Sequence, residues 1–260
     1  MREPVLYDLR DQVAWVTLNT PENRNAMSES TILALEEALR RALADGSARA
    51  IVLGAKGQAF CAGADLKSPE GAGFAPVPGD ERPPAFTRVV DLMWHSPKPV
   101  LGQVQGSAFG AGVSLITAMD VVVCVNDAQF AINEILLGLA PHRLPLYLHQ
   151  RGLLGVFRKL MLTGERFSAE AAREMGLVHE VVPRERLGMT VAGELRKLLR
   201  CAPRAWSELK AYLTALPDMS FDEGTLYGQR LRARLYEIGE IYEGKAAFRE
   251  RRPPAWAPKP

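Results

Sequence analysis

Apolar and polar positions divide the first third of the chain into short strands, a helix and a turn. Residues 5–19, VLYDLRDQVAWVTLN, alternate apolar and polar side chains, which predicts two short half-buried strands. In residues 28–45 the apolar positions recur every three or four residues, so we predict a helix that follows Ser28. Residues 48–66, ARAIVLGAKGQAFCAGADL, then predict a buried strand, a loop and a turn of small residues.

The same alternation of helices and strands continues to about residue 182. Residues 85–96 predict a helix, residues 97–106 a strand, and residues 108–119 a glycine-rich turn followed by a helix. The strand DVVVCVND follows, and after Pro183 only helical patterns remain, over residues 185–250. This order predicts an α/β fold in which helices pack against sheet. We divide the chain into a core of residues 1–190 and a helical C-terminal region of residues 191–260.

One long connection interrupts this pattern. Residues 68–84, SPEGAGFAPVPGDERPP, are rich in glycine and proline and hold few apolar anchors. Long loops without secondary structure are often functional, so we predict a mobile segment that covers or shapes a neighbouring site.

The composition excludes several classes of protein. With 47% hydrophobic and 24% charged residues in a chain of 260, the sequence is that of an ordinary globular protein able to bury a large core. The net charge of +2 includes no concentrated basic stripe, and we assign the run KAAFRERR to a solvated helix face rather than to nucleic-acid binding. No apolar run of about 18 residues and no N-terminal leader pattern occurs, so we expect a soluble protein without a membrane segment.

Cysteines and histidines give no sign of a metal centre or a hydrolytic triad. The sparse, odd number of cysteines suits a reducing compartment, and we expect a cytoplasmic protein without metal. Cys61 and Cys124 lie in apolar strand-like segments, as small buried hydrophobic residues do. Structural roles account for His95, His149 and His179.

Two turns of small residues resemble each other. FCAGADL, residues 60–66, and FGAGVSL, residues 109–115, each place an apolar residue before a turn that opens toward a helix. Small residues let a substrate approach the main chain, and two N–H groups that converge on one oxygen form an oxyanion hole. A dinucleotide-binding GxGxxG turn is excluded because Leu115 stands at the third glycine, and a phosphate-binding GK[ST] motif does not occur.

Six segments in order resemble the enoyl-CoA hydratase/isomerase (crotonase) family along nearly the whole chain. They are NTPENRNAMS, AIVLGAKGQAFCAGADLKS, KPVLGQVQGSAFGAGVSLITAMDVVVCVNDAQFA, NEILLGLAP, KLMLTGERFSAEAAREMGLVHEVVP and EGKAAFRERRPPAW. The resemblance implies a spiral of ββα units with a C-terminal helical region, assembled as a homotrimer or hexamer. It also implies an acyl-CoA thioester substrate, with no cofactor besides the CoA that the substrate carries.

The resemblance also assigns roles to particular residues. It implies that the backbone N–H groups of Ala64 and Ala111 hold the thioester oxygen. It places the CoA moiety along the segment that begins at Ala62, and we expect Arg24 to face the CoA phosphates. His142 lies near the position of a catalytic aspartate in related dehalogenases, and it either contacts the acyl group or water or has no role. The remaining expected substrate contacts are Asp65, Leu66, Lys67 and Gly110.

The number of acids decides the expected reaction. Typical hydratases of this family position one water with two glutamates, and the resemblance places these at Ser114 and Glu134, so one acid of the two is present. Burial in the apolar run AINEILLGL should raise the pKa of Glu134, which suits a general acid near neutral pH.

Three alternatives remain. The first is a hydratase that uses Glu134 alone, with Ser114 helping to hold water. Hydratases of the methylglutaconyl-CoA type also lack the first acid, and they loosely share the pattern GLAPHRLPLYL. The second is an isomerase that shifts the double bond of an enoyl-CoA, for which one carboxylate suffices. The third is a CoA-binding paralogue with little catalytic activity.

Overall fold

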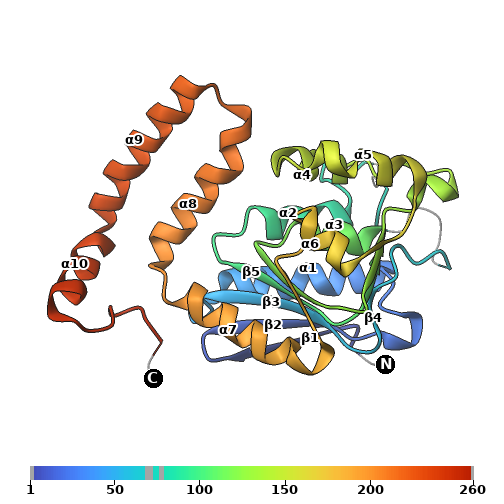
Figure 1. Ribbon diagram of the computed structural model, residues 1–260, viewed down its shortest axis with the longest axis horizontal. Coiled ribbons are helices and arrows are strands. Elements are labelled where there is room, and N and C mark those ends of the chain that lie inside the picture. The colour runs from blue at the N-terminus through green and yellow to red at the C-terminus, as the bar shows by residue number, and fades with distance from the viewer. Residues whose placement is uncertain (1–2, 68–72, 76–78, 259–260) are drawn as a thin grey trace.

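Two β-sheets form the centre of the fold (Figure 1), and successive segments of the chain contribute strands to each of them. The computed structural model describes residues 3–67, 73–75 and 79–258. The larger sheet has the strand order β1-β2-β3-β5-β7-β10 and the smaller one β4-β6-β8-β9. The strands are β1 Val5–Arg10, β2 Val13–Leu18, β3 Ala50–Ala55, β4 Ala59–Cys61, β5 Val100–Val104, β6 Ser107–Phe109, β7 Val121–Val125, β8 Gln129–Ala131, β9 Phe167–Ser168 and β10 Glu180–Val182.

The order of the strands shows how the spiral advances. β1 and β2 form the antiparallel hairpin that the alternation of residues 5–19 predicts. From β2 onward the larger sheet is parallel. The pairs β3 and β4, β5 and β6, and β7 and β8 each give one strand to each sheet, and helices lead from one pair to the next. This is the spiral of ββα units expected from the sequence, and that prediction is confirmed.

The helices begin and end close to the predicted positions. Ser28 caps the first helix by accepting a hydrogen bond from the backbone N–H of Thr31, which satisfies one of the free donors of the first turn. The α-helices are α1 Glu29–Ala44, α2 Ala85–Trp94, α3 Ala111–Thr117, α4 Leu144–Gln150, α5 Leu154–Thr163, α6 Ala169–Glu174, α7 Leu187–Leu199, α8 Pro203–Ala215, α9 Phe221–Ile238 and α10 Glu240–Glu250. The 3₁₀ helices are η1 Pro21–Asn23, η2 Glu134–Leu137, η3 Arg184–Arg186 and η4 Leu216–Asp218.

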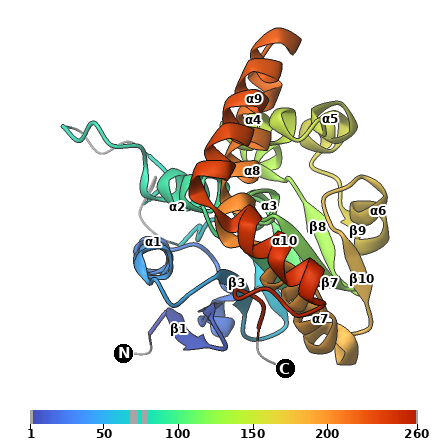
Figure 2. The ribbon, with the colours of Figure 1, turned by 90° about the vertical axis from the view of Figure 1, so that its left-hand side faces the viewer.

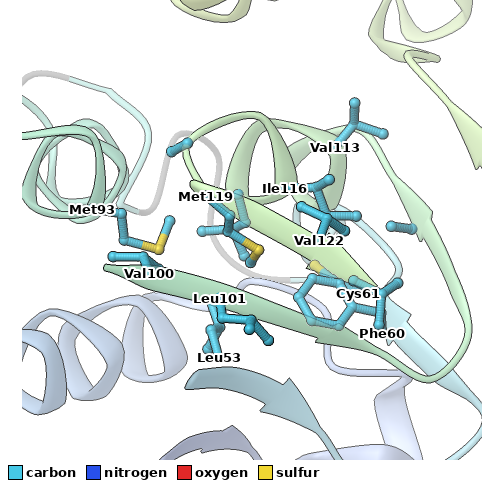
Figure 3. Packing of buried hydrophobic residues seen from close by; sticks show 14 of the residues in the cluster. Leu53, Phe60, Cys61, Met93, Val100, Leu101, Val113, Ile116, Met119 and Val122 are labelled. Atoms are coloured by element: carbon cyan, nitrogen blue, oxygen red, sulfur yellow. The ribbon is translucent and has the colours of Figure 1, made fainter. Parts of the chain in front are cut away.

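The core lies where the sheets meet α3. All seven residues of α3 are buried, and β3, β5 and β7 are nearly continuous apolar runs, as strands of a parallel sheet covered on both faces are. Figure 3 shows Phe60 and Cys61 of β4 in the same cluster as Ile116 of α3 and Val122 of β7. The packing therefore fixes the N-terminal end of α3 relative to the end of β4.

The C-terminal helices divide into two groups. α7 packs against β3, β5 and β7, so the boundary drawn between residues 190 and 191 falls inside a helix that lies on the sheet. α8, α9 and α10 extend away from the sheets (Figures 1 and 2). The chain end returns to the core, where the Arg49 guanidinium donates hydrogen bonds to the carbonyls of Trp256 and Cys201. In the described part of the chain, no strand follows β10 and no helix is long and apolar enough to cross a membrane.

The loop expected over residues 68–84 is described only in part, since residues 68–72 and 76–78 lie outside the described ranges. Its middle contacts α2. The ring centroids of Phe74 and Phe86 are 4.8 Å apart, and the Phe86 N–H donates to the carbonyl of Gly73 at 2.8 Å. The prediction that this loop covers a site stays a prediction.

Candidate active site

The two turns of small residues lie against each other. A Cβ atom built on Gly63 would be 3.1 Å from the carbonyl oxygen of Phe109 and 3.9 Å from the nitrogen of Ala111. One built on Gly112 would be 2.8 Å from the carbonyl oxygen of Cys61, a distance that no real Cβ tolerates. Glycine at both positions therefore lets the main chain after β4 approach the start of α3.

The N–H group of Ala64 faces away from its neighbouring segment. Ala64 forms an isolated parallel bridge with Met27, in which Met27 donates to the carbonyl of Gly63 at 2.8 Å and accepts from the N–H of Asp65 at 3.2 Å. In a parallel pairing of this kind the residue between the two bonded groups directs its own N–H to the other side. Within the described ranges, the N–H of Ala64 has no hydrogen-bond partner, and the residue is exposed.

The N–H group of Ala111 is likewise free to bind a ligand. Ala111 is the first residue of α3, and the first N–H groups of a helix have no partner within it. Gly110 turns the chain into the helix with φ 49° and ψ −113°, a conformation open to glycine but strained for other residues. No other described residue accepts a hydrogen bond from Ala111, whose side chain is 6% exposed.

The carboxyl group of Glu134 lies beside this turn. Glu134 begins η2, and its Oε1 would be 3.3 Å from a Cβ built on Gly110, the residue directly before the Ala111 N–H. Desolvation by burial raises the pKa of Glu134 above its usual value. Its Oε2 is buried and has no hydrogen-bond partner among the described residues. The carboxyl group thus lies next to the turn, and no described residue forms a salt bridge with it that would favour the ionised form.

The apolar residues around Glu134 differ in burial, since Ala131 and Ile132 before it are buried. Large apolar side chains directly after Glu134 are exposed, namely Ile135, Leu136, Leu137 and Leu139. The expected rise in pKa and its expected cause, desolvation by burial, are confirmed, and the carboxyl group is buried beside Gly110 of the second turn.

Asn133 is a site residue that the sequence analysis missed. Its Oδ1 would be 3.5 Å from the same Cβ position on Gly110 that lies 3.3 Å from Glu134 Oε1. Two polar side chains, one ionisable and one neutral, therefore lie beside Gly110. The only signal in the sequence is the adjacency of the two residues in NEILLG, which does not show that both point the same way.

Ser114 lies one helical turn after Ala111. It is 8% exposed, and its backbone N–H donates to the carbonyl of Gly110 at 3.2 Å. Residues three apart on a helix share a face, so the side chain of Ser114 lies on the same face of α3 as that of Ala111. Gly110 thus links the two residues, since its carbonyl accepts from the Ser114 N–H and its Cβ position lies beside the Glu134 carboxyl group.

The residues expected to contact CoA lie along one exposed edge. The N–H of Ala62 donates to the carbonyl of Arg24 at 3.0 Å, which joins the loop before α1 to the segment after β4. Arg24, Leu66 and Lys67 are exposed and Asp65 is half-buried, with its carboxylate accepting from the Lys67 N–H at 3.0 Å. Their CoA contacts stay a prediction.

Histidines contribute little to this arrangement. His142 is exposed in the loop before α4 and forms no hydrogen bond or ion pair with any other described residue. His179 has a structural role, since its Nδ1 accepts from the Val122 N–H at 3.0 Å and its backbone N–H donates to the Val122 carbonyl.

Cys61 and Cys124 are buried free thiols, as expected, and Cys201 is exposed. No group of three possible metal ligands occurs in the described residues.

Comparisons with known proteins agree on one family. The family model described as enoyl-CoA hydratase/isomerase matches residues 8–259. The chain is 32% identical to the (E)-benzylidenesuccinyl-CoA hydratase of Thauera aromatica, over 97% of this chain and 98% of that protein. It is 34% identical to the carnitinyl-CoA dehydratase of Salmonella arizonae, over 93% of each.

Solved structures show the same similarity in three dimensions. Pseudomonas aeruginosa AtuE superimposes with a TM-score of 0.89 and 32% identity, covering 98% of this chain and all of that one. An enoyl-CoA hydratase from Mycobacterium smegmatis gives a TM-score of 0.87 and 30% identity, over 98% of this chain and 99% of that one.

Proposed function

The chain belongs to the enoyl-CoA hydratase/isomerase family, and from this premise we propose that it adds water across the α,β double bond of an enoyl-CoA thioester or catalyses the reverse dehydration. The observation that carries the proposal is the carboxyl group of Glu134 next to the turn that ends in the free N–H of Ala111. Relatives named as a hydratase and a dehydratase of acyl-CoA thioesters support the same reaction type.

The two free N–H groups would bind the thioester oxygen. When a nucleophile attacks the β-carbon, the electron pair of the double bond moves toward the carbonyl and an enolate forms, with its negative charge on the oxygen. Fixed N–H dipoles from Ala64 and Ala111 stabilise that charge without having to reorient. Loss of one such donor typically costs about 2.7–4 kcal/mol of transition-state stabilisation.

One carboxyl group can carry both proton transfers. Ionised Glu134 takes a proton from water while the oxygen of that water forms a bond to the β-carbon. The protonated Glu134 then gives the proton to the α-carbon, the carbonyl re-forms, and the carboxylate is regenerated. A raised pKa favours this exchange near neutral pH, because it makes the carboxylate a stronger base toward water and brings its pKa closer to the working pH, where one group can act as both base and acid.

A double-bond isomerase is the second candidate. It is favoured by the serine at position 114, since a single carboxylate can remove a proton from one carbon and return it to another. Asn133 weighs toward hydration, because its side-chain amide beside Glu134 offers a second polar group for a water molecule.

A panel of enoyl-CoA thioesters separates the candidates. Hydration removes the conjugated ultraviolet absorbance of a 2-enoyl-CoA and adds the mass of one water. Isomerisation creates that absorbance from a 3-enoyl-CoA without a change of mass. Binding without either change would overturn the proposal in favour of a CoA-binding paralogue. Glu134→Gln is the site control, and the exposed Glu37→Gln is its matched control.

We also propose a homotrimer or hexamer in the cytoplasm. Large apolar side chains on the extended C-terminal helices support assembly, since Phe221 is 89% and Phe248 86% exposed in the single chain. Sedimentation of the purified protein tests the oligomeric state, and a monomer at micromolar concentration would contradict the proposed assembly.

A further inference from the structure

A cavity lies between α8 and the residues at the C-terminal ends of α2, α3 and α4. Figures 1 and 2 show the arrangement of these helices. The volume of the cavity is about 420 Å³, within the range of small-molecule sites, which is roughly 300–1,000 Å³. The lining residues that matter here are Trp94, Asp120, Gln150, Arg151, Trp206 and Lys210.

This cavity is distinct from the thioester site. α3 runs from Ala111 to Thr117, about 9 Å at 1.5 Å per residue, and the cavity lining begins one residue later at Ala118. The free N–H of Ala111 and the cavity thus lie at opposite ends of one buried helix.

One carboxylate and two cations meet in the wall of the cavity. Asp120 Oδ2 accepts from Lys210 Nζ at 2.8 Å and from the Val100 N–H at 2.8 Å. Lys210 Nζ also donates to the carbonyl of Met93 at 3.1 Å. The two side chains are largely buried, with 21% of Asp120 and 11% of Lys210 exposed. Asp120 and Lys210 form an ion pair, whereas Arg151 forms none with a described residue. The carboxylate of Asp218 accepts from the neighbouring Gln150 Nε2 at 2.8 Å.

Arg151 has an unused donor. Its Nη2 donates to the carbonyl of Met119 at 2.5 Å, whereas its Nη1 is buried and has no partner among the described residues. Burial lowers the pKa of Arg151, yet a guanidinium stays charged in proteins. Gln150 Oε1 is also buried without a partner in the described chain, so it offers an acceptor to a hydroxyl group or a water molecule. A buried cation with a free N–H is the donor that a carboxylate binds well.

The rest of the wall is aromatic and aliphatic. Trp94 and Trp206 line the cavity together with Leu209 and Leu213, and Lys210 Nζ lies 5.5 Å from the centroid of the Trp206 ring. Flat apolar ligands gain both buried area and ring contacts between tryptophans.

We propose that this cavity is a second binding site, separate from the thioester site, for a small carboxylate with a flat apolar body, held by Arg151 and packed against the two tryptophans. This goes beyond the proposed reaction, because no atom of the cavity takes part in it.

The test uses ¹⁹F NMR titration of the full-length protein with 4-fluorobenzoate and with its neutral analogue 4-fluorobenzamide. We expect the carboxylate to bind at least about tenfold more tightly than the amide, since a charge-assisted hydrogen bond is roughly twice as strong as a neutral one. Arg151→Met should remove this preference. Equal binding of the two probes, or no binding of either, would refute the site.

A second variant keeps the test valid if Arg151→Met fails to fold. Leu209→Trp adds bulk at the rim without touching the charged groups, and Leu226→Trp on α9 is its matched control, as the two leucines are 48% and 46% exposed. Only Leu209→Trp should weaken 4-fluorobenzoate binding, again about tenfold.

Saturation with butyryl-CoA separates this site from the thioester site. It should leave probe binding unchanged, and displacement of the probe would show that the cavity belongs to the acyl site instead. Glu134→Gln should bind 4-fluorobenzoate like the wild type even if the proposed reaction proves wrong.

Discussion

Glu134→Gln should make the protein less active and more stable at the same time. The variant keeps the size of the side chain but removes the group that exchanges protons, so turnover should fall about 10²–10⁴-fold, the usual contribution of a positioned acid or base. Burial raises the pKa of Glu134, which means that the folded state disfavours its ionised form.

The gain in stability can be estimated from the burial of Oε2. A buried polar atom without a partner costs about 1–3 kcal/mol, and more when it is charged. The glutamine still has polar atoms to satisfy there, so we expect a gain near the lower limit, about 1 kcal/mol. For a chain of this size that corresponds to a rise in Tm of about 2–4 °C.

The pH dependence gives the sharpest check. Because the folded-state pKa is raised, the protonated carboxyl is favoured in the folded protein. Its contribution is fully present below the unfolded pKa, about 4.5, and is lost as the pH rises through the folded value. The difference in Tm between variant and wild type should therefore grow between acidic and neutral pH, when measured by calorimetry at fixed protein concentration. Retained turnover, or a Tm difference that is the same at pH 4 and pH 8, would refute the reasoning.

Three further substitutions test the supports of the site. Gly110→Ala should lower kcat/KM, because its Cβ would press on the Glu134 carboxyl at 3.3 Å and the backbone φ of 49° would be strained; steady-state kinetics with unchanged circular dichroism checks this. Asn25→Ala removes side-chain hydrogen bonds to the carbonyls of Lys56 and Ala59, and we expect a loss of about 1–3 kcal/mol in urea unfolding. Glu36→Gln breaks the ion pair with Arg88 that joins α1 to α2, at 2.7 Å, and should cost about 1.5–3 kcal/mol at pH 7. Since hydrogen bonds from Arg88 lower the pKa of Glu36, this stability is present above the unfolded pKa and is lost as the pH falls through the folded one, so the two proteins should converge in acid.

Local structure followed closely from the sequence. The alternation of residues 5–19 gave the hairpin of β1 and β2, and Ser28 caps α1 as its position suggests. These features depend on neighbours in the chain, which a pattern of apolar and polar residues records directly. The assignment of strands to two sheets depends on pairing between distant segments, and here the six ordered family segments, rather than periodicity, carried the prediction.

The site could be predicted less fully, because its parts come from separate segments. The two glycine turns could be identified, but the sequence does not show that Gly63 approaches Ala111, since a contact between residues 48 apart depends on packing in three dimensions. Asn133 was missed for the same reason. Burial of Glu134 and the resulting rise in its pKa were predicted, but the sequence did not show that the apolar residues after Glu134 are exposed.

The serine at position 114 is consistent with the placement of Glu134. A second carboxylate at position 114 would lie in a fully buried helix that begins directly after Gly110, the residue beside the Glu134 carboxyl group. Two neighbouring carboxylates disfavour each other's ionised forms, so a second acid here would raise the pKa of Glu134 further. With a hydroxyl at Ser114 and a neutral amide at Asn133, Glu134 is the one group here that can change its charge. A water molecule held by such neutral groups can still give its proton to Glu134, so the geometry favours a single carboxyl group that both takes and returns the proton.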